Sequence, residues 1–194
     1  MYAVFPRCRL RINLLAVPSF FMMLYLEGLL PTGLLLLSAF LHEGGHLLAI
    51  RYVGAPIRRV DLLPMGGLIV YDQSSCSPMD CALVSAAGPM ANLLAFFLCL
   101  PFASRSPYLL FFVLANAFLA LLNLLPWEVL DGGNLLFCLL LARRDPLYAE
   151  RVCKAVSRVS SVLLALLFVL LGLSSRFPLW YLLLSAMLLV TAFR

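Results

Sequence analysis

The chain has 194 residues, of which 64% are hydrophobic and 12% are charged, and its mean hydropathy is +1.04. An ordinary soluble domain has about 45–50% apolar and about 25% charged residues, so this composition excludes a soluble globular protein and indicates a membrane protein. The formal net charge of +5 does not by itself indicate a nucleic-acid partner, because basic residues in a membrane protein usually report its orientation.

Long apolar runs bounded by charges, prolines or glycines predict an all-α membrane protein with six transmembrane helices. A hydrocarbon core about 30 Å thick requires about 20 apolar residues per helix, so a chain of this length holds about six spans and short connections. We place the spans near residues 12–27, 32–51, 82–102, 108–126, 157–173 and 178–193. The segment after Arg11 lacks an obvious signal-peptide cleavage site, so we interpret it as a retained span.

The distribution of basic residues predicts the orientation. Six spans place both termini on one side of the membrane, and 12 of the 14 Lys and Arg residues then lie on that side, whereas Arg105 and Arg176 lie on the other. Cytoplasmic loops carry the excess of Lys and Arg, so we predict a multi-pass protein of the cell membrane with both termini cytoplasmic. The excess of basic residues is therefore explained by membrane orientation, and no nucleic-acid partner is expected. We interpret residues 143–158 as a charged cytoplasmic linker.

Residues 57–71, with the sequence IRRVDLLPMGGLIVY, are too short and too broken to span the membrane as a helix. Their β-branched residues favour strands, while Pro64, Gly66 and Gly67 are typical of turns, so we predict a short β-hairpin or re-entrant strand region after the second span. Irregular backbone at membrane depth must be buried by protein or reached by water, which makes this segment a candidate wall of a cavity. A plain interfacial loop is the alternative.

The two histidines of the chain, His42 and His46, lie within the predicted second span in the sequence HEGGH. Residues four apart on a helix differ by about 40° in azimuth and about 6 Å in rise, so both imidazoles can bind one ion. Glu43 is placed to take a proton from zinc-bound water without ligating the metal, as in H-E-x-x-H motifs. Ionisable side chains inside a span cost at least about 2.5–3.5 kcal/mol each on insertion scales, so three together indicate a function rather than hydrogen bonding within the bundle.

A catalytic zinc normally has three protein ligands and a water, so a third ligand is expected, and without a third histidine it must be a carboxylate or a thiolate. Asp131 follows the fourth span in NLLPWEVLDGG, where Pro126 interrupts helical hydrogen bonding and two glycines free the backbone. Such a segment can turn a carboxylate back toward the second span; the alternative is a solvated D-G-G turn. The other carboxylates near apolar runs sit at span ends or in loops: Glu27, Asp61, Asp72 and Asp80.

Three segments together, LHEGGH at 41–46, AAGPMAN at 86–92 and NLLPWEVLDGG at 123–133, resemble the signature regions of the site-2 protease family of intramembrane zinc metalloproteases. The compact six-span layout is most similar to the sporulation-type branch, which processes a membrane-associated precursor of a sigma factor. The resemblance covers roughly residues 30–135. We therefore expect a single polytopic protease domain over residues 1–194, with its catalytic core at about 30–135 and two extra C-terminal spans at about 157–193.

The resemblance assigns roles to matching residues. It implies that His42, His46 and Asp131 hold one Zn²⁺ ion and that Glu43 is the catalytic glutamate. Asn123, eight residues before the aspartate, matches a family asparagine that helps place substrate or stabilises the oxyanion, so it is the second expected catalytic residue.

Three further residues are expected to bind substrate on the same resemblance. Asn92 matches a family asparagine after Gly-Pro, and Gly67 lies in the strand region to which an extended substrate adds as a strand. Pro126 belongs to the turn before the aspartate, which departs from the family by having a single proline and an acidic side chain.

We thus predict a metalloendopeptidase that hydrolyses a peptide bond in or near the membrane segment of a membrane-bound protein, in regulated proteolysis. The alternative is a non-proteolytic membrane metal-binding protein or transporter, which should carry several acidic residues along a path through the bilayer. A catalytically inactive scaffold is a third class, and the intact Glu43 argues against it. The expected partners are the lipid bilayer and the protein substrate, with an inhibitory or regulatory membrane partner left open.

Overall fold

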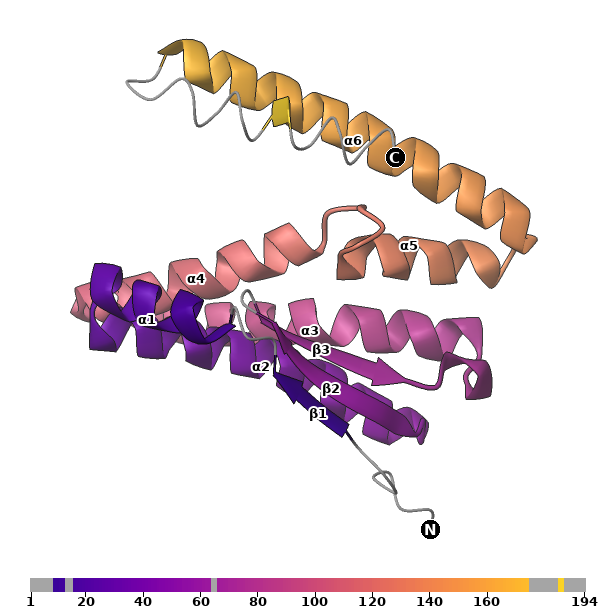
Figure 1. Cartoon of the computed structure of the whole chain (residues 1–194), viewed down its shortest axis with the longest axis horizontal. Helices are drawn as coiled ribbons and strands as arrows, with labels where there is room; N and C mark the ends of the chain where they lie inside the picture. Colours follow the sequence, from indigo (N-terminus) through magenta and orange to yellow (C-terminus); the bar gives the residue numbers. More distant parts are fainter. Residues whose placement is uncertain (1–8, 13–15, 64–65, 175–184, 187–194) are drawn as a thin grey trace. The chain divides into compact units, whose positions relative to one another are not determined.

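The computed structural model describes residues 9–12, 16–63, 66–174 and 185–186, which fall into two compact units divided after Leu124 (Figure 1). The first unit contains β1 (Arg9–Ile12), α1 (Ala16–Glu27), α2 (Leu29–Val53), β2 (Ile57–Leu63), β3 (Gly66–Tyr71), α3 (Pro78–Cys99) and α4 (Pro107–Asn123). Two 3₁₀ helices connect them, η1 (Gln73–Ser75) and η2 (Leu100–Arg105). The second unit contains α5 (Asp131–Leu141) and α6 (Pro146–Ser174).

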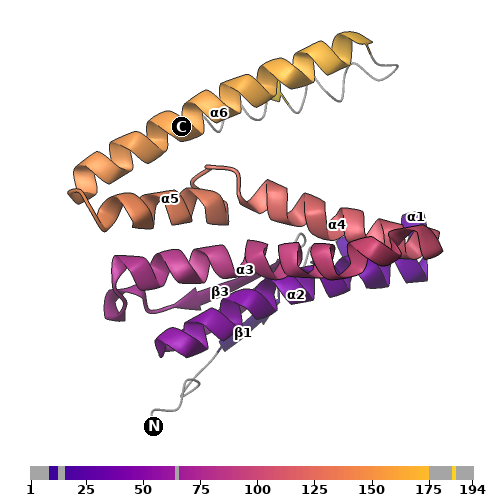
Figure 2. The ribbon, with the colours of Figure 1, turned by 180° about the vertical axis from the view of Figure 1, so that it is seen from behind.

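Helices α2, α3 and α4 of the first unit pack against one another, as both ribbon views show (Figures 1 and 2). Their exposed positions include large apolar residues such as Phe40 on α2 and Phe118 on α4, which are 74% and 64% exposed. Their interior instead holds polar side chains, among them Ser38, Asn92 and Asn116, each 0% exposed. Apolar residues outside and hydrogen-bonded polar residues between helices are typical of a bundle surrounded by lipid.

The helix ends follow from local sequence. Ser77 caps α3 by accepting a hydrogen bond from the Asp80 backbone N–H, while the Asp80 side chain accepts from the Ser77 N–H, and Pro78 occupies the first helical position. Helix α2 ends at Gly54, whose φ of 78° lies in the left-handed region that favours glycine. These signals fix where α2 stops and α3 starts, and so hold the strands between them.

The strands form a sheet of order β1-β2-β3. β2 and β3 are antiparallel with Ile57 opposite Tyr71 and Leu63 opposite Gly66, so the expected hairpin at 57–71 is confirmed. β1, which the sequence analysis did not predict, pairs in parallel with β2. The sheet packs on α2 and α3 through a small core: Ala49, Ile50, Ala55, Ile57 and Val84, with Val60, Ile69 and Tyr71 against it.

The predicted class, a helical membrane protein with a short hairpin, is confirmed. Within the described residues, three helices are long and apolar enough to cross a membrane, at Leu29–Val53, Pro78–Arg105 and Pro146–Leu170, and α4 and α5 are shorter apolar helices. The expected sixth span at 178–193 lies outside the described residues except for 185–186, so the count of six stays a prediction.

Residues 143–158 differ from the charged linker that the sequence analysis expected. Helix α6 begins at Pro146, and the Asp145 side chain accepts a hydrogen bond from the Tyr148 N–H at 3.0 Å. An aspartate before a proline at the first helical position is a standard start signal, which explains why the charged segment is helical.

Candidate metal centre

His42 and His46 project from the same face of α2, as their spacing predicts. Their Nε2 atoms lie 3.2 Å apart, and the ring centroids are 4.8 Å apart with the rings nearly perpendicular. His42 is buried, with 7% of its surface exposed, and His46 is partly buried. The first unit therefore brings two imidazole nitrogens to one point within an apolar helix bundle.

The other ring nitrogen of each histidine meets an oxygen acceptor. His42 Nδ1 lies 2.6 Å from Asn92 Oδ1, and His46 Nδ1 lies 2.8 Å from the backbone carbonyl oxygen of Val84. A carbonyl oxygen can only accept, so each Nδ1 carries the hydrogen and donates it. In the neutral rings both Nε2 atoms then present lone pairs, which is the protonation pattern that metal-ligating histidines show.

This donor set fits a zinc ion. Two nitrogens bound to one zinc at about 2.0–2.1 Å with a tetrahedral angle lie about 3.3 Å apart, close to the spacing of the two Nε2 atoms. Lone pairs converging at 3.2 Å repel unless a cation lies between them, and both histidines offer such ligand atoms. The pair is therefore suited to a shared metal ion, as the family resemblance implies.

Two glycines make room for this arrangement. A Cβ atom at Gly88 on α3 would overlap the His46 ring, so this position admits no side chain beside the imidazole. A Cβ at Gly45 would collide with the backbone of Ala87 and lie 2.9 Å from the Ala91 Cβ. The second glycine of HEGGH thus lets α2 approach α3 closely enough for His46 to meet Val84.

Glu43 lies against strand β3. A Cβ built at Gly67 would be 3.0 Å from the Glu43 Cδ and 3.3 Å from its Oε1. Because β3 is an outer strand of the described sheet, one of its edges is not covered by β2. The hairpin therefore brings an extended backbone directly beside the carboxylate that the sequence analysis assigned as the base.

Three asparagines that the structure describes in the first unit, Asn92, Asn116 and Asn123, differ in their surroundings. Asn92 is fully buried and hydrogen-bonded to His42, so its side chain faces a histidine rather than an open surface. Asn123 is partly buried at the end of α4, where its Nδ2 donates to the Leu119 carbonyl oxygen at 3.0 Å. Asn116, which the sequence analysis missed, is fully buried beside Asn92. A lone asparagine in the apolar run FFVLANAFLA was the signal that could have indicated it.

Asp131 is the first residue of α5 and belongs to the second unit. The segment before it makes two tight turns, with Trp127 N–H donating to the Leu125 carbonyl oxygen at 2.8 Å and Leu130 N–H to the Trp127 carbonyl oxygen at 2.9 Å. A Cβ at Gly133 would overlap the Trp127 carbonyl, so the turn requires glycine there. A carboxylate at a helix N-terminus is also favoured by the helix dipole.

A charged contact outside the spans ties the hairpin to the chain that follows it. Arg58 Nη2 on β2 lies 2.7 Å from Asp72 Oδ2, directly after β3. The hydrogen bonds from Arg58 and then from Ser74 lower the pKa of Asp72 to about 2. The carboxylate is therefore ionised at neutral pH and supports the end of the hairpin.

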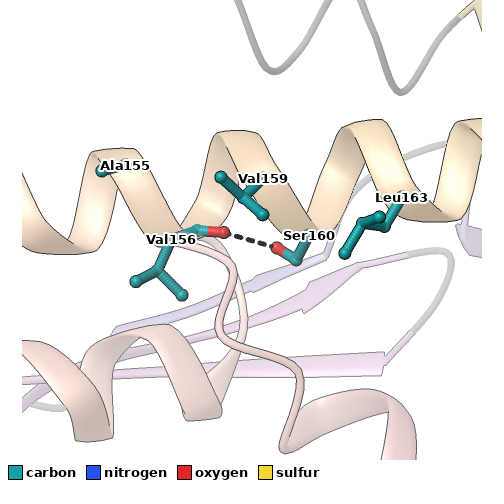
Figure 3. Close-up of a pocket in the computed structure, with 5 residues that line it drawn as sticks. All are labelled: Ala155, Val156, Val159, Ser160 and Leu163. Carbon is teal, nitrogen blue, oxygen red and sulfur yellow. Dashed lines mark hydrogen bonds between the residues drawn. The ribbon is translucent and has the colours of Figure 1, made fainter.

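The second unit has a shallow apolar hollow of about 290 Å³ on α6, lined by Ala155, Val156, Val159, Ser160 and Leu163 (Figure 3). The Ser160 hydroxyl donates to the Val156 carbonyl oxygen at 2.9 Å, so its hydrogen stays within the helix. None of the five lining side chains is ionisable, and the hollow offers no group for hydrolytic chemistry.

Comparisons with known proteins find similarity to metalloproteases. The pattern of Peptidase family M50 matches residues 101–167. A zinc metalloprotease from Methanocaldococcus jannaschii is 29% identical over 149 residues, which cover 73% of this chain and 43% of that protein. Stage IV sporulation protein FB from Bacillus subtilis is 34% identical over 110 residues, 54% of this chain and 38% of that protein.

The solved structure of a site-2 protease from Methanocaldococcus jannaschii has a similar fold, with a TM-score of 0.61 at 21% identity, over 94% of this chain and 88% of that chain. This chain spans less than half the length of the curated relatives that it matches.

Proposed function

We propose that this chain is an intramembrane zinc metalloendopeptidase of Peptidase family M50, whose pattern matches residues 101–167 and whose zinc metalloprotease relatives it resembles. The observation that carries the proposal is the pair of Nε2 atoms of His42 and His46, which converge at 3.2 Å with both Nδ1 hydrogens donated elsewhere. Glu43 directly follows His42 in α2 and supplies a carboxylate, which lies beside Gly67 of β3.

We propose Asp131 as the third ligand of a single zinc ion. A catalytic zinc needs three protein ligands, and an oxygen ligand with two imidazoles is a common set. Support comes from the turn before α5, whose hydrogen bonds and Gly133 fix the backbone that carries Asp131. The match to family M50 also covers this segment.

The proposed chemistry is peptide hydrolysis. When bound, zinc supplies Lewis acidity, polarising the scissile carbonyl and lowering the pKa of a water toward about 7. Glu43 accepts a proton from the attacking water as the new C–O bond forms, and returns it to the amine nitrogen as the C–N bond breaks. His42 and His46 keep their Nδ1 hydrogens throughout, since Asn92 and Val84 hold them.

We further propose that the substrate is a membrane-bound protein whose cleaved segment lies extended along β3. An extended peptide can add to a sheet edge through backbone hydrogen bonds, and Gly67 lets that backbone approach Glu43. Asn123 donates one Nδ2 hydrogen to Leu119, so the second can stabilise the oxyanion of the substrate carbonyl. Pro126 shapes the turn that follows and would border the substrate.

Orientation and domain organisation complete the proposal. Both termini face the cytoplasm because 12 of 14 basic residues then lie on the cytoplasmic side. Residues 1–194 act as one protease domain in the cell membrane, and a regulatory membrane partner covers or uncovers its site. Reporter fusions to each terminus measure the orientation directly.

Glu43→Gln tests the function. We expect it to abolish cleavage of a co-expressed library of tagged single-span proteins while zinc content stays nearly unchanged, because the carboxylate is a base and not a ligand. Glu27→Gln, at the end of α1, is the matched control and should cleave normally. Retained cleavage by Glu43→Gln would contradict the assigned base, and an uncleaved protein trapped by it would identify the substrate.

A further inference from the structure

A buried chain of hydrogen bonds runs from the candidate metal ligand His42 across three helices. It passes from His42 on α2 to Asn92 on α3, then to Asn116 on α4, and returns to Ser38 on α2. Ser38, Asn92 and Asn116 are each 0% exposed, so water does not substitute for any of these contacts.

The donor and the acceptor of each hydrogen bond in this series follow from the Ser38 hydroxyl, where the series ends. The Ser38 hydroxyl donates to the Leu34 carbonyl oxygen at 2.9 Å, so its oxygen accepts from Asn116 Nδ2, also at 2.9 Å. The second Nδ2 hydrogen of Asn116 goes to the Phe112 carbonyl oxygen at 2.8 Å. Both donor sites of this amide are thereby used, and its Oδ1 must face α3 as an acceptor.

The hydrogen bond to Asn116 fixes the orientation of the Asn92 amide. Its Nδ2 donates to Asn116 Oδ1 at 2.8 Å and to the Ser38 carbonyl oxygen at 3.0 Å. Its Oδ1 is left facing His42 Nδ1 at 2.6 Å, where it can only accept. A flipped Asn92 amide would set oxygen against two acceptor oxygens, so the network excludes it.

We propose that Asn92, Asn116 and Ser38 are positioning residues that hold His42 in the tautomer with its lone pair on Nε2, directed at the metal. This inference rests on the proposed function, since it treats His42 as a zinc ligand. Partners that orient a ligating histidine in this way typically change metal affinity about 10–100-fold when they are removed.

His46 is oriented by a backbone group, whereas His42 is oriented by a side chain. Its Nδ1 donates to the backbone carbonyl of Val84, which no side-chain substitution deletes. Pro89 lies inside α3 and lacks an N–H, so the helical hydrogen bond to the carbonyl of Ser85, the residue after Val84, cannot form. One ligand is thus oriented by backbone and the other by a side-chain network that mutation can break.

The test measures Zn²⁺ affinity of the full chain in detergent by competition with a chelator, together with the visible absorption of the Co²⁺-loaded protein. Asn92→Leu and Asn116→Leu should weaken Zn²⁺ binding about 10–100-fold and reduce the tetrahedral Co²⁺ bands. Ser38→Ala should cause a smaller loss in the same direction, and it decides the matter if Asn116→Leu does not fold.

Thr32→Val is the matched control. Thr32 is 1% exposed and its hydroxyl donates to the Met23 carbonyl oxygen at 3.3 Å, so it too is a buried hydrogen-bonding residue of α2, but it lies about 15 Å along the helix from His42. Zn²⁺ affinity should stay within about twofold of the wild type in this variant. An equal loss in Thr32→Val would show general loosening of the bundle and overturn the proposal.

A His42→Ala variant distinguishes failure of the metal centre from failure of the positioning residues. If it abolishes Zn²⁺ binding while Asn92→Leu and Asn116→Leu bind like the wild type, the positioning proposal is wrong and the metal centre stands. If His42→Ala binds Zn²⁺ like the wild type, both the metal centre and its positioning are wrong.

Discussion

Gly88 on α3 adjoins the His46 imidazole so closely that a Cβ atom at position 88 would overlap Nε2, Cε1 and Cδ2 of the ring. The glycine of the AAGPMAN segment therefore has a stereochemical role in the candidate metal centre. It leaves the space in which His46 turns its Nε2 toward His42.

Gly88→Ala should displace the His46 ring and weaken Zn²⁺ binding by at least about tenfold, since a ligand held out of place loses metal affinity. Chelator competition on the purified protein measures this effect. Gly33→Ala on α2, where an added Cβ meets no atom within 4 Å, is the control and should bind Zn²⁺ normally. Equal affinity of Gly88→Ala and the wild type would show that the ring does not occupy this space.

The two central glycines of HEGGH should differ in their effect on stability. Gly45→Ala forces α2 and α3 apart, because its Cβ would collide with the Ala87 backbone, and overpacking of this kind costs about 1–3 kcal/mol. Gly44→Ala meets open space and should be neutral or stabilise the helix by up to about 1 kcal/mol. Unfolding in mixed detergents compares the two, and similar stabilities would contradict the packing described here.

Gly67→Ala should slow cleavage while leaving zinc content unchanged. Its Cβ would lie 3.0 Å from the Glu43 Cδ, so the carboxylate or the strand must shift. A misplacement of about 1 Å at a reacting group can cost about a hundredfold in rate, and we expect a loss of about tenfold to a hundredfold in kcat. An unchanged kcat in this variant would show that the contact between β3 and Glu43 does not matter for the reaction.

Arg58→Met should make the stability of the protein less dependent on acid pH. The pKa of Asp72 is lowered to about 2 in the folded chain, first by the Arg58 hydrogen bond, against an ordinary value of 3.8. The stabilisation is therefore present above about pH 4 and lost as pH falls through about 2. Unfolding midpoints of the two proteins should differ at neutral pH and converge near pH 2; a constant difference would refute the linkage.

Much of the fold could be predicted from the sequence, and the element that was missed has a physical reason. Composition predicted the membrane helices, and Pro64, Gly66 and Gly67 predicted the hairpin, because both signals are local. β1 was missed because the alternating Arg9 to Ile12 segment is short and pairs with a strand some 50 residues later, as Arg9 opposite Arg59 shows.

The site was predictable only in part for a similar reason. The HEGGH spacing predicts that His42 and His46 share one face of a helix, as they do. Which groups hold the Nδ1 atoms depends on α3 and α4 packing against α2, so the sequence did not indicate the contact between Asn92 and His42, and Asn116 was not singled out. The family match adds a prediction for Asp131 that periodicity could not give.

The proposed metal centre has one zinc ion held by two imidazoles of α2 and the carboxylate of Asp131. Zinc K-edge X-ray absorption of the wild type and of Asp131→Ala tests it most directly. We expect one zinc per chain with two imidazole nitrogens and further oxygen ligands at about 2.0–2.2 Å, and a changed set of zinc ligands in Asp131→Ala. Sulfur neighbours at about 2.3 Å, or identical spectra for the two proteins, would contradict it.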